Sequence, residues 1–150
     1  MKFFITFITF IALFFNAIAL ETPKLATLEI IVEDFDSNEG HLRVHLFNTK
    51  TAKYFPDKSN EAYKWQQVKI KNGKVKVVFK DIPYGRYAAT LHHDSNNNEK
   101  MDLTWLGMPD EGWGLSTDVI PVFSLPDFED CAFDVYRPVV QYKIKIRYLP

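Results

Sequence analysis

Side chains able to coordinate a cation are concentrated in one short segment, "HHDSNNNEKMD", at residues 92–102. Oxygen-bearing side chains recur from its first aspartate onward, at Asp94, Asn96, Asn98 and Asp102. These are positions one, three, five and nine of a calcium-binding loop, in which alternating side chains point toward the ion. Nitrogen and sulfur ligands are sparse, which favours calcium over zinc. The spacing predicts a calcium-type site.

Two departures from the calcium pattern favour a different interpretation. Glu99 stands at position six, where a turn glycine is expected, and Trp105 stands at position twelve in place of a bidentate glutamate. The alternative is a polar loop without metal, in which Asp and Asn side chains cap their own backbone as Asx turns. We prefer this alternative, and a calcium site of millimolar-range affinity is the second interpretation.

The histidines do not converge on one ligand in the predicted strands. His92 and His93 are adjacent, so their side chains point to opposite faces of a strand. His41 and His45 share a face but lie four residues apart, roughly 13 Å along an extended chain. These spacings exclude a shared metal within either pair.

Catalysis has a weaker basis than binding. A hydrolase or carbohydrate-processing enzyme would use His93, Asp94 and Glu111, but the Gly-x-Ser-x-Gly nucleophile elbow is absent from the sequence. Ser116, in "GWGLSTD", is a lone serine with no recognisable base. Convergence of His93, Asp94 and Glu111 in one cleft would favour the enzyme. Burial of these side chains under the loop would favour a binding or structural role.

Aromatic side chains accompany the irregular parts of the chain. Trp65, Trp105 and Trp113 lie in or beside them, and exposed rings there could stack on a glycan or grip a protein partner. The alternative, which we prefer, is that Trp105 and Trp113 pack the long loop onto the body of the domain. A ligand or partner surface on this loop would comprise His93, Trp105, Glu111, Trp113 and Ser116.

Period-two alternation recurs along the chain and is typical of half-buried strands. The clearest windows are residues 26–32, 42–46, 68–79, 86–93 and 140–148. No window of comparable quality has a helical period. About seven short strands with turns between them predict an all-β antiparallel sandwich, immunoglobulin-like or transthyretin-like. A closed barrel is the competing architecture.

The segment "VKIKNGKVKVVF" predicts a β-hairpin. Asn72-Gly73 supplies the positive backbone dihedrals of a type I′ turn. This turn would place Val68 opposite Val77, with apolar residues on one face and lysines on the other.

Two segments lack alternation. Residues 49–64 predict a loop with a helical turn, and residues 94–127 are longer than a compact domain usually leaves irregular. Long ordered loops on a rigid scaffold often carry function, so the second segment is the expected working surface.

The N-terminus has the pattern of a secretory signal peptide. A lysine and an apolar run over residues 3–15 precede "AIA", whose small residues predict cleavage after Ala19. The apolar run is short for a membrane span, and an uncleaved anchor is the alternative. We expect a signal peptide at 1–19 and one domain at 20–150. The domain would be exported to the periplasm or the extracellular space, without a membrane span.

Composition argues against a nucleic-acid-binding protein and against a domain stabilised by disulfides. The 18 basic and 19 acidic residues nearly balance and form no block of like charge, which disfavours a nucleic-acid partner. Cys131 is the single cysteine, so an intrachain disulfide is impossible. Cys131 alternates with Phe133 and Val135, which predicts a buried, inert thiol.

Three segments together resemble a known bacterial family. They are "FKDIPYGRYAATLHHDSNNNEKMD", "GMPDEGWGLS" and "PDFEDCAFDV", and they resemble the exported proteins grouped as domain of unknown function 2141. The family pattern runs through a Pro-x-Gly-x-Tyr-Ala turn, His-Asp-x-Asn-x-Asn-Gly, and Gly-x-Pro-x-Glu-Gly-x-Gly-x-Ser. Matching residues are Pro83, Gly85, Tyr87, Ala88, His93, Asp94, Asn96, Asn98, Asp102, Gly107, Pro109, Glu111, Gly112, Gly114 and Ser116.

The resemblance implies export and a sandwich fold, and it implies no established activity. The chain departs from the family pattern at Glu99, which replaces the glycine of the loop. The resulting hypothesis is a non-enzymatic exported β-sandwich that binds an unidentified protein or glycan through residues 94–116, with calcium ordering the loop if it binds. An enzyme and a structural envelope component are the alternatives.

Overall fold

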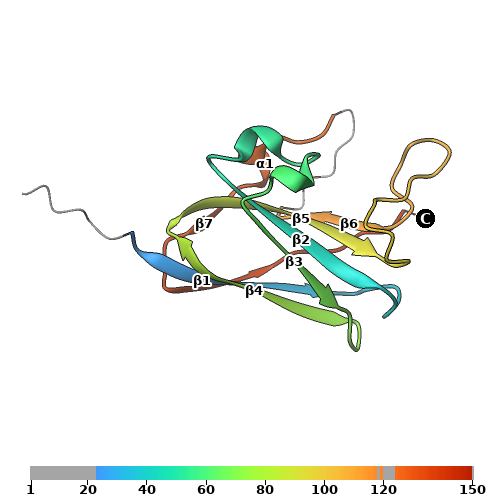
Figure 1. Ribbon diagram of the computed structural model, residues 1–150, viewed down its shortest axis with the longest axis horizontal. Coiled ribbons are helices and arrows are strands. Elements are labelled where there is room, and N and C mark those ends of the chain that lie inside the picture. Colours follow the sequence, from blue (N-terminus) through green and yellow to red (C-terminus); the bar gives the residue numbers. More distant parts are fainter. Residues whose placement is uncertain (1–22, 118, 120–123, 150) are drawn as a thin grey trace, which may run out of the picture.

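The computed structural model describes residues 23–117, 119 and 124–149, which form two β-sheets (Figure 1). The three-stranded sheet has the order β4-β1-β8, with β1 Leu25–Glu33, β4 Lys74–Pro83 and β8 Val139–Lys143. The other sheet has the order β3-β2-β5-β6, with β7 also paired to β5. Its strands are β2 His41–Asn48, β3 Lys64–Lys69, β5 Gly85–Asp94, β6 Gly112–Leu115 and β7 Phe133–Val135.

The predicted all-β sandwich is confirmed, with eight strands in the described residues. Neighbouring strands are antiparallel except for β1 and β8, which run parallel. Two separate sheets are present in place of the alternative closed barrel. The predicted signal peptide at 1–19 lies outside the described residues.

The core lies between the two sheets and follows the predicted alternation. Side chains of β1 alternate between buried and half-exposed, and Leu28, Ile30 and Val32 are fully buried. They belong to the same apolar cluster as Leu42 and Val44 of β2. Burial of these faces supplies the main driving force that holds the sheets together.

A second apolar cluster covers one end of the outer face of the larger sheet. Phe47 and Ala88 project from the sheet, and Phe55 and Phe128 pack over them. The covering segments contain the 3₁₀ turns Ala52–Tyr54 and Ser59–Glu61 and the one-turn helix α1, Phe128–Cys131. The helical turn predicted within residues 49–64 is therefore present. Cys131 is buried as predicted, and burial raises the pKa of its thiol.

The predicted turn at Asn72-Gly73 is confirmed, but the hairpin pairing is wrong. Both residues have positive φ, 55° and 66°, and the turn closes with a Lys71–Lys74 bridge. Beyond that bridge the strands separate, because β3 pairs with β2 while β4 pairs with β1. β3 and β4 thus lie in opposite sheets that share one core, and Val68 and Val77 pack into that core from the two sides.

The C-terminal window and the long irregular segment also differ from prediction. The last strand, β8, ends at Lys143, and the chain then crosses to the other sheet, where Arg147 bridges Trp113. Trp113 lies in β6, a strand within the segment 94–127 that was expected to be irregular. β6 contains two glycines in four residues, so alternation is hard to detect there.

The turn before β2 leaves no space for a side chain, and this predicts the cost of a substitution. Gly40 has φ 65°, and a Cβ there would lie 1.9 Å from the carbonyl oxygen of Asp94. Gly73 has nearly the same φ, 66°, but its Cβ would meet open space.

We expect Gly73→Ala to cost about 1–2 kcal/mol, the penalty of the left-handed conformation alone. Gly40→Ala should cost about 1–3 kcal/mol more, because the backbone of the Asp94 loop must also shift. Urea unfolding of both variants measures the difference. Equal losses of stability would contradict the close approach.

Candidate functional site

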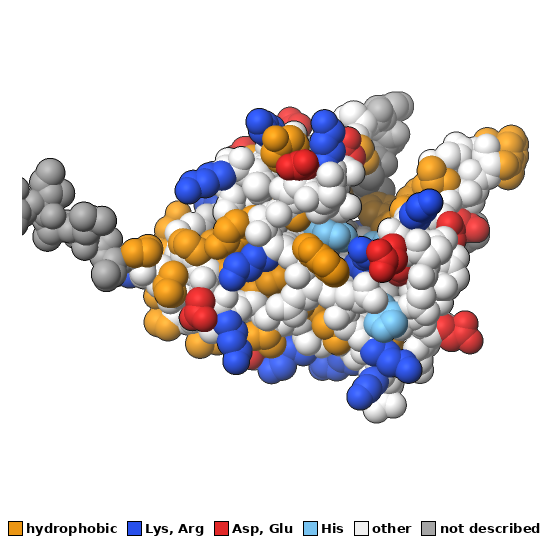
Figure 2. All heavy atoms as spheres, viewed as in Figure 1, with side chains coloured by type: hydrophobic (Ala, Val, Ile, Leu, Met, Phe, Trp, Pro, Cys, Tyr) orange, Lys and Arg blue, Asp and Glu red, His pale blue; other side chains and the backbone are white. Residues whose placement is uncertain are grey.

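A groove crosses the uncovered part of the outer face of the larger sheet. Its floor is formed by β2, β5 and β6, and its walls are the segment around residues 56–59 and the loop at 99–109. The cavity has a volume of about 690 Å³. Figure 2 shows this face hollowed between the lobe that carries the 3₁₀ turns and the projecting loop. Hydrophobic side chains that line it are Met101, Leu103, Met108, Trp113, Leu115, Leu125 and Leu149.

We call residues 94–111, which include the groove wall at 99–109, the wall loop. Backbone N–H groups that donate to the Asp94 carboxylate fix the first turn of this loop. The side chain of Asp94 is fully buried and accepts the backbone N–H groups of Asn98 at 3.1 Å and Glu99 at 3.0 Å. Asn97 and Glu99 have positive φ, 61° and 63°. Glu99 therefore adopts the conformation for which the family pattern has glycine, and the Asp94 carboxylate stabilises that backbone.

The remaining predicted calcium ligands lie together on this turn. Asp102 accepts hydrogen bonds from the side-chain amide of Asn96 at 2.6 Å and from that of Asn98 at 2.9 Å. The amide oxygens of Asn96 and Asn98 in turn accept backbone N–H groups two residues ahead. These are the Asx turns of the preferred interpretation. Both amides would have to rotate for their oxygens to face a cation beside Asp102.

Glu111 connects the end of β5 to both ends of the wall loop. One carboxylate oxygen lies 2.7 Å from Nε2 of His92 and accepts the N–H of Asp102 at 3.3 Å. The other accepts the N–H and the hydroxyl of Ser95 at 2.9 and 3.0 Å. Burial raises the pKa of Glu111, but the hydrogen bonds from His92, Ser95 and Asp102 outweigh it, so the pKa lies below 4.5.

His92, Asp94 and Glu111 form a compact buried group. One ligand atom from each lies within 4.8 Å of the others, a spacing compatible with a shared metal ion. However, the oxygens of Asp94 and Glu111 already accept hydrogen bonds from the protein. The group therefore acts as a hydrogen-bonded support for the loop, in which protein donors satisfy the carboxylate oxygens of Asp94 and Glu111.

His93 points away from this group, as the alternation of β5 predicts. Its ring contacts the Tyr148 hydroxyl at 2.7 Å and the backbone carbonyl of Glu39 at 2.9 Å. It is also edge-on to Phe35 and 1% exposed. The structure does not bring His93, Asp94 and Glu111 into one open cleft, and all three side chains are buried.

Trp113 is the one residue of the predicted surface that lines the groove, and the alternation of β2 could have identified two more, Arg43 and His45. Arg43 and His45 share the outward face, and Arg43 stands opposite His92 in the β2–β5 register. The Arg43 guanidinium lies over the Trp65 ring at 5.6 Å, and its Nη1 is 3.6 Å from Asp94 and 3.7 Å from Glu99. Burial, with Arg43 and His92 nearby, lowers the pKa of His45 to about 4.

The other residues of the predicted surface occupy different environments. Trp105 is 91% exposed at the loop tip, so the prediction that it packs onto the domain is wrong. Trp113 is half-buried and lines the groove. Ser116 is buried, and its hydroxyl accepts the Ala89 N–H at 3.0 Å and donates to the Cys131 carbonyl at 2.5 Å. Ser116 thus holds β5 to the chain around α1.

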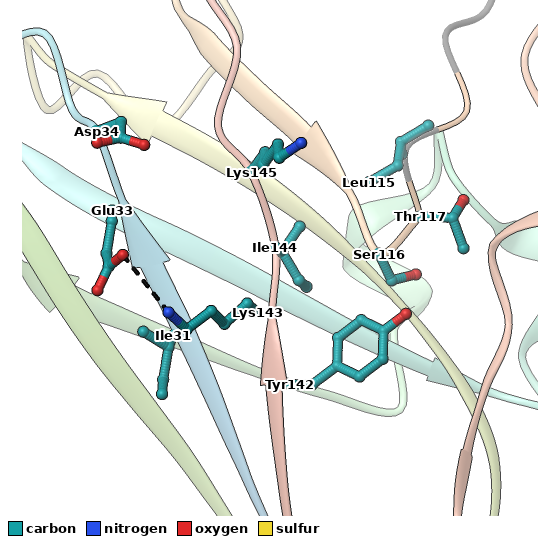
Figure 3. Close-up of a pocket in the computed structure, with 10 residues that line it drawn as sticks. All are labelled: Ile31, Glu33, Asp34, Leu115, Ser116, Thr117, Tyr142, Lys143, Ile144 and Lys145. Atoms are coloured by element: carbon teal, nitrogen blue, oxygen red, sulfur yellow. Dashed lines mark ion pairs between the residues drawn. The ribbon is translucent and has the colours of Figure 1, made fainter.

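A second cavity, of about 390 Å³, lies where the two sheets approach each other beside β6 (Figure 3). Its lining includes Lys143, which faces Glu33 at a distance of 3.8 Å. Lysines and carboxylates occur together there, so their charges compensate. Apart from Ser116, no residue of the predicted site lines this cavity.

These features define a β-sandwich protein with a hydrogen-bonded polar loop beside an apolar groove. A family model described as "Uncharacterized protein conserved in bacteria (DUF2141)" matches residues 30–143, and the chain belongs to this family. Neither a curated protein nor a solved structure matches the chain significantly. In the part of the chain that the structure describes, no helix has the length and apolar character needed to span a membrane.

The role of Glu111 as a support predicts a loss of stability when its charge is removed. Glu111→Gln should destabilise the protein by roughly 1–3 kcal/mol, because several buried donors lose a charged acceptor. The pKa of Glu111 is lowered in the folded state. Its stabilisation is therefore complete above about pH 4.5 and is lost as the pH falls through the folded pKa.

Urea unfolding between pH 3 and pH 7 measures both effects, and the variant should lack this part of the pH dependence. Glu129→Gln is the matched control, since the Glu129 side chain is 66% exposed and pairs with Arg86 at the surface. A Glu111 variant as stable as the control variant would contradict the supporting role.

Proposed function

We propose that this protein is an exported, non-enzymatic binding protein, and that the groove beside the 94–111 loop holds a largely apolar ligand. The observation that carries the proposal is the groove itself, about 690 Å³ in volume and lined mainly by aliphatic and aromatic side chains. Cavities of this size and character are typical of small-molecule sites.

The polar groups of the groove support binding over chemistry. His92 is held by Glu111, and His45 has a pKa near 4, so it is neutral at physiological pH. Nε1 of Trp113 has no hydrogen-bond partner among the described residues, and Nη1 of Arg43 faces the carboxylates of Asp94 and Glu99 at 3.6 and 3.7 Å. A ligand with an apolar body and an acceptor group would fit both properties of the lining.

A fluorescent dye with an apolar ring system and an anionic group, such as anilinonaphthalene sulfonate, tests the groove directly. The double variant Leu103→Gln/Met108→Gln should bind the dye about tenfold more weakly or worse, because each side chain contributes apolar surface to the groove. Both positions are exposed, 58% and 45%, so the fold should survive. Leu25→Gln, at a position 48% exposed and outside the groove, should bind the dye like the unmodified protein. Equal affinities in all three proteins would reject the site.

As the alternative to a metal-free loop, we also propose a calcium site that orders the 94–102 turn. Asn96, Asn98 and Asp102 already lie within hydrogen-bond distance of one another, and Asp94 fixes the backbone that carries them. Rotation of two amides would present oxygens to an ion beside Asp102, a ligand chemistry that suits calcium. In this arrangement the ion takes no part in a reaction and stiffens the wall of the groove.

A thermal melt with millimolar calcium and then with chelator tests the calcium proposal. Binding to the folded state should raise the unfolding midpoint by mass action, and Asp102→Asn should abolish most of the shift. Asp57→Asn, on the opposite wall of the groove, is the control and should retain the shift. A midpoint unchanged by millimolar calcium in the unmodified protein would reject the calcium proposal.

A further inference from the structure

Exposed apolar side chains gather around one part of the described surface. Ten large apolar residues in the described chain are at least 41% exposed, and six of them belong to the groove or to the adjoining loop tip. These six are Leu103, Trp105, Leu106, Met108, Leu125 and Leu149. Single exposed apolar residues scattered over a surface are common, whereas a contiguous group of them marks an interaction surface.

The loop tip is an ordered, convex knob. Residues 103–109, "LTWLGMP", carry no charge. The N–H of Gly107 donates to the Thr104 carbonyl at 2.9 Å, which places Trp105 and Leu106 at the corner of a β-turn. A Leu103–Pro109 bridge closes the base of the turn. The knob projects from the body of the protein (Figures 1 and 2).

The knob does not fill the groove beside it. Leu103 and Met108, on the sides of the loop, line the groove, whereas Trp105 and Leu106 do not. Trp105 is 91% and Leu106 60% exposed. The chain therefore presents a convex apolar surface and a concave apolar surface side by side.

We propose that two copies of this chain associate by reciprocal insertion, the Trp105–Leu106 knob of each copy entering the groove of the other. A small ligand would fill the groove and leave the knob in water, and a lipid bilayer would cover the knob and leave the groove open. A second copy offers both shapes at once, and a two-fold axis matches each to its complement. This inference rests on the proposed function, since it uses the same groove and identifies the largely apolar ligand as the knob of a second copy.

Sedimentation equilibrium over a wide range of concentration tests the association. The experiment uses the protein isolated after export, with its N-terminus verified by mass spectrometry. The mass of the unmodified protein should rise toward twice the monomer mass, and the double variant Trp105→Ser/Leu106→Ser should associate at least tenfold more weakly. Leu25→Ser/Tyr136→Ser removes two exposed apolar side chains elsewhere and should associate normally.

A mixing experiment distinguishes insertion from nonspecific adhesion. Thr90→Arg, on the groove floor, keeps the knob but obstructs the groove. Mixing it with Trp105→Ser/Leu106→Ser should restore association through one intact knob and one intact groove. If Thr90→Arg does not fold, the fluorescent dye serves instead, and it should dissociate the dimer of the unmodified protein by occupying the groove.

The outcomes separate the two proposals. A protein that binds the dye in the groove but stays monomeric at every concentration overturns the dimer and leaves the proposed function standing. Loss of both dye binding and association overturns both. A monomer whose tryptophan emission shifts to the blue on phosphatidylcholine vesicles, and not in the Trp105→Ser/Leu106→Ser variant, overturns the dimer in favour of a lipid surface.

Discussion

The groove depends on one buried carboxylate. Glu111 is 6% exposed and accepts hydrogen bonds from Ser95, at the start of the wall loop, and from Asp102, at the base of its tip, while it faces His92 on β5. A carboxylate in such a position is tolerated only when donors surround it. Because those donors belong to separate parts of the chain, satisfying Glu111 also sets the path of residues 95–111. That path forms one wall of the groove.

The floor of the groove follows from the two-residue period of its strands. On β5, His92 faces outward and His93 faces the core, where it contacts Tyr148. On β2 the same alternation directs Arg43 outward and Val44 into the core. A shift of one residue in the register would exchange the two sets and place an arginine in the apolar core. The polar floor and the apolar core are therefore fixed by the same pairing.

Local features of the chain could be predicted from the sequence, whereas the pairing of the strands could not. The alternation of β1, β2, β4 and β5, the turn at Asn72 and the opposed histidines depend on residues close in sequence, and the structure has all of these. The separation of β3 and β4 depends on the competing strands β1 and β2, which alternation does not rank. The environment of Trp105 was predicted wrongly for a related reason. Hydrophobicity indicates that burial would stabilise a side chain, but it does not show whether residues of the same chain bury it.

Glu99 shows how a buried side chain of the same loop stabilises a residue in an unfavourable backbone conformation. Five non-glycine residues in the described chain have positive φ, and Glu99 is the one that is neither Asp nor Asn. Such a backbone costs about 1–2 kcal/mol. The ion pair of Glu99 with Arg43, with the glutamate 72% exposed, returns about 0–1 kcal/mol. The hydrogen bond from the Glu99 N–H to the buried Asp94 carboxylate offsets the remaining cost, so the Asp94 side chain lets a non-glycine residue occupy this turn.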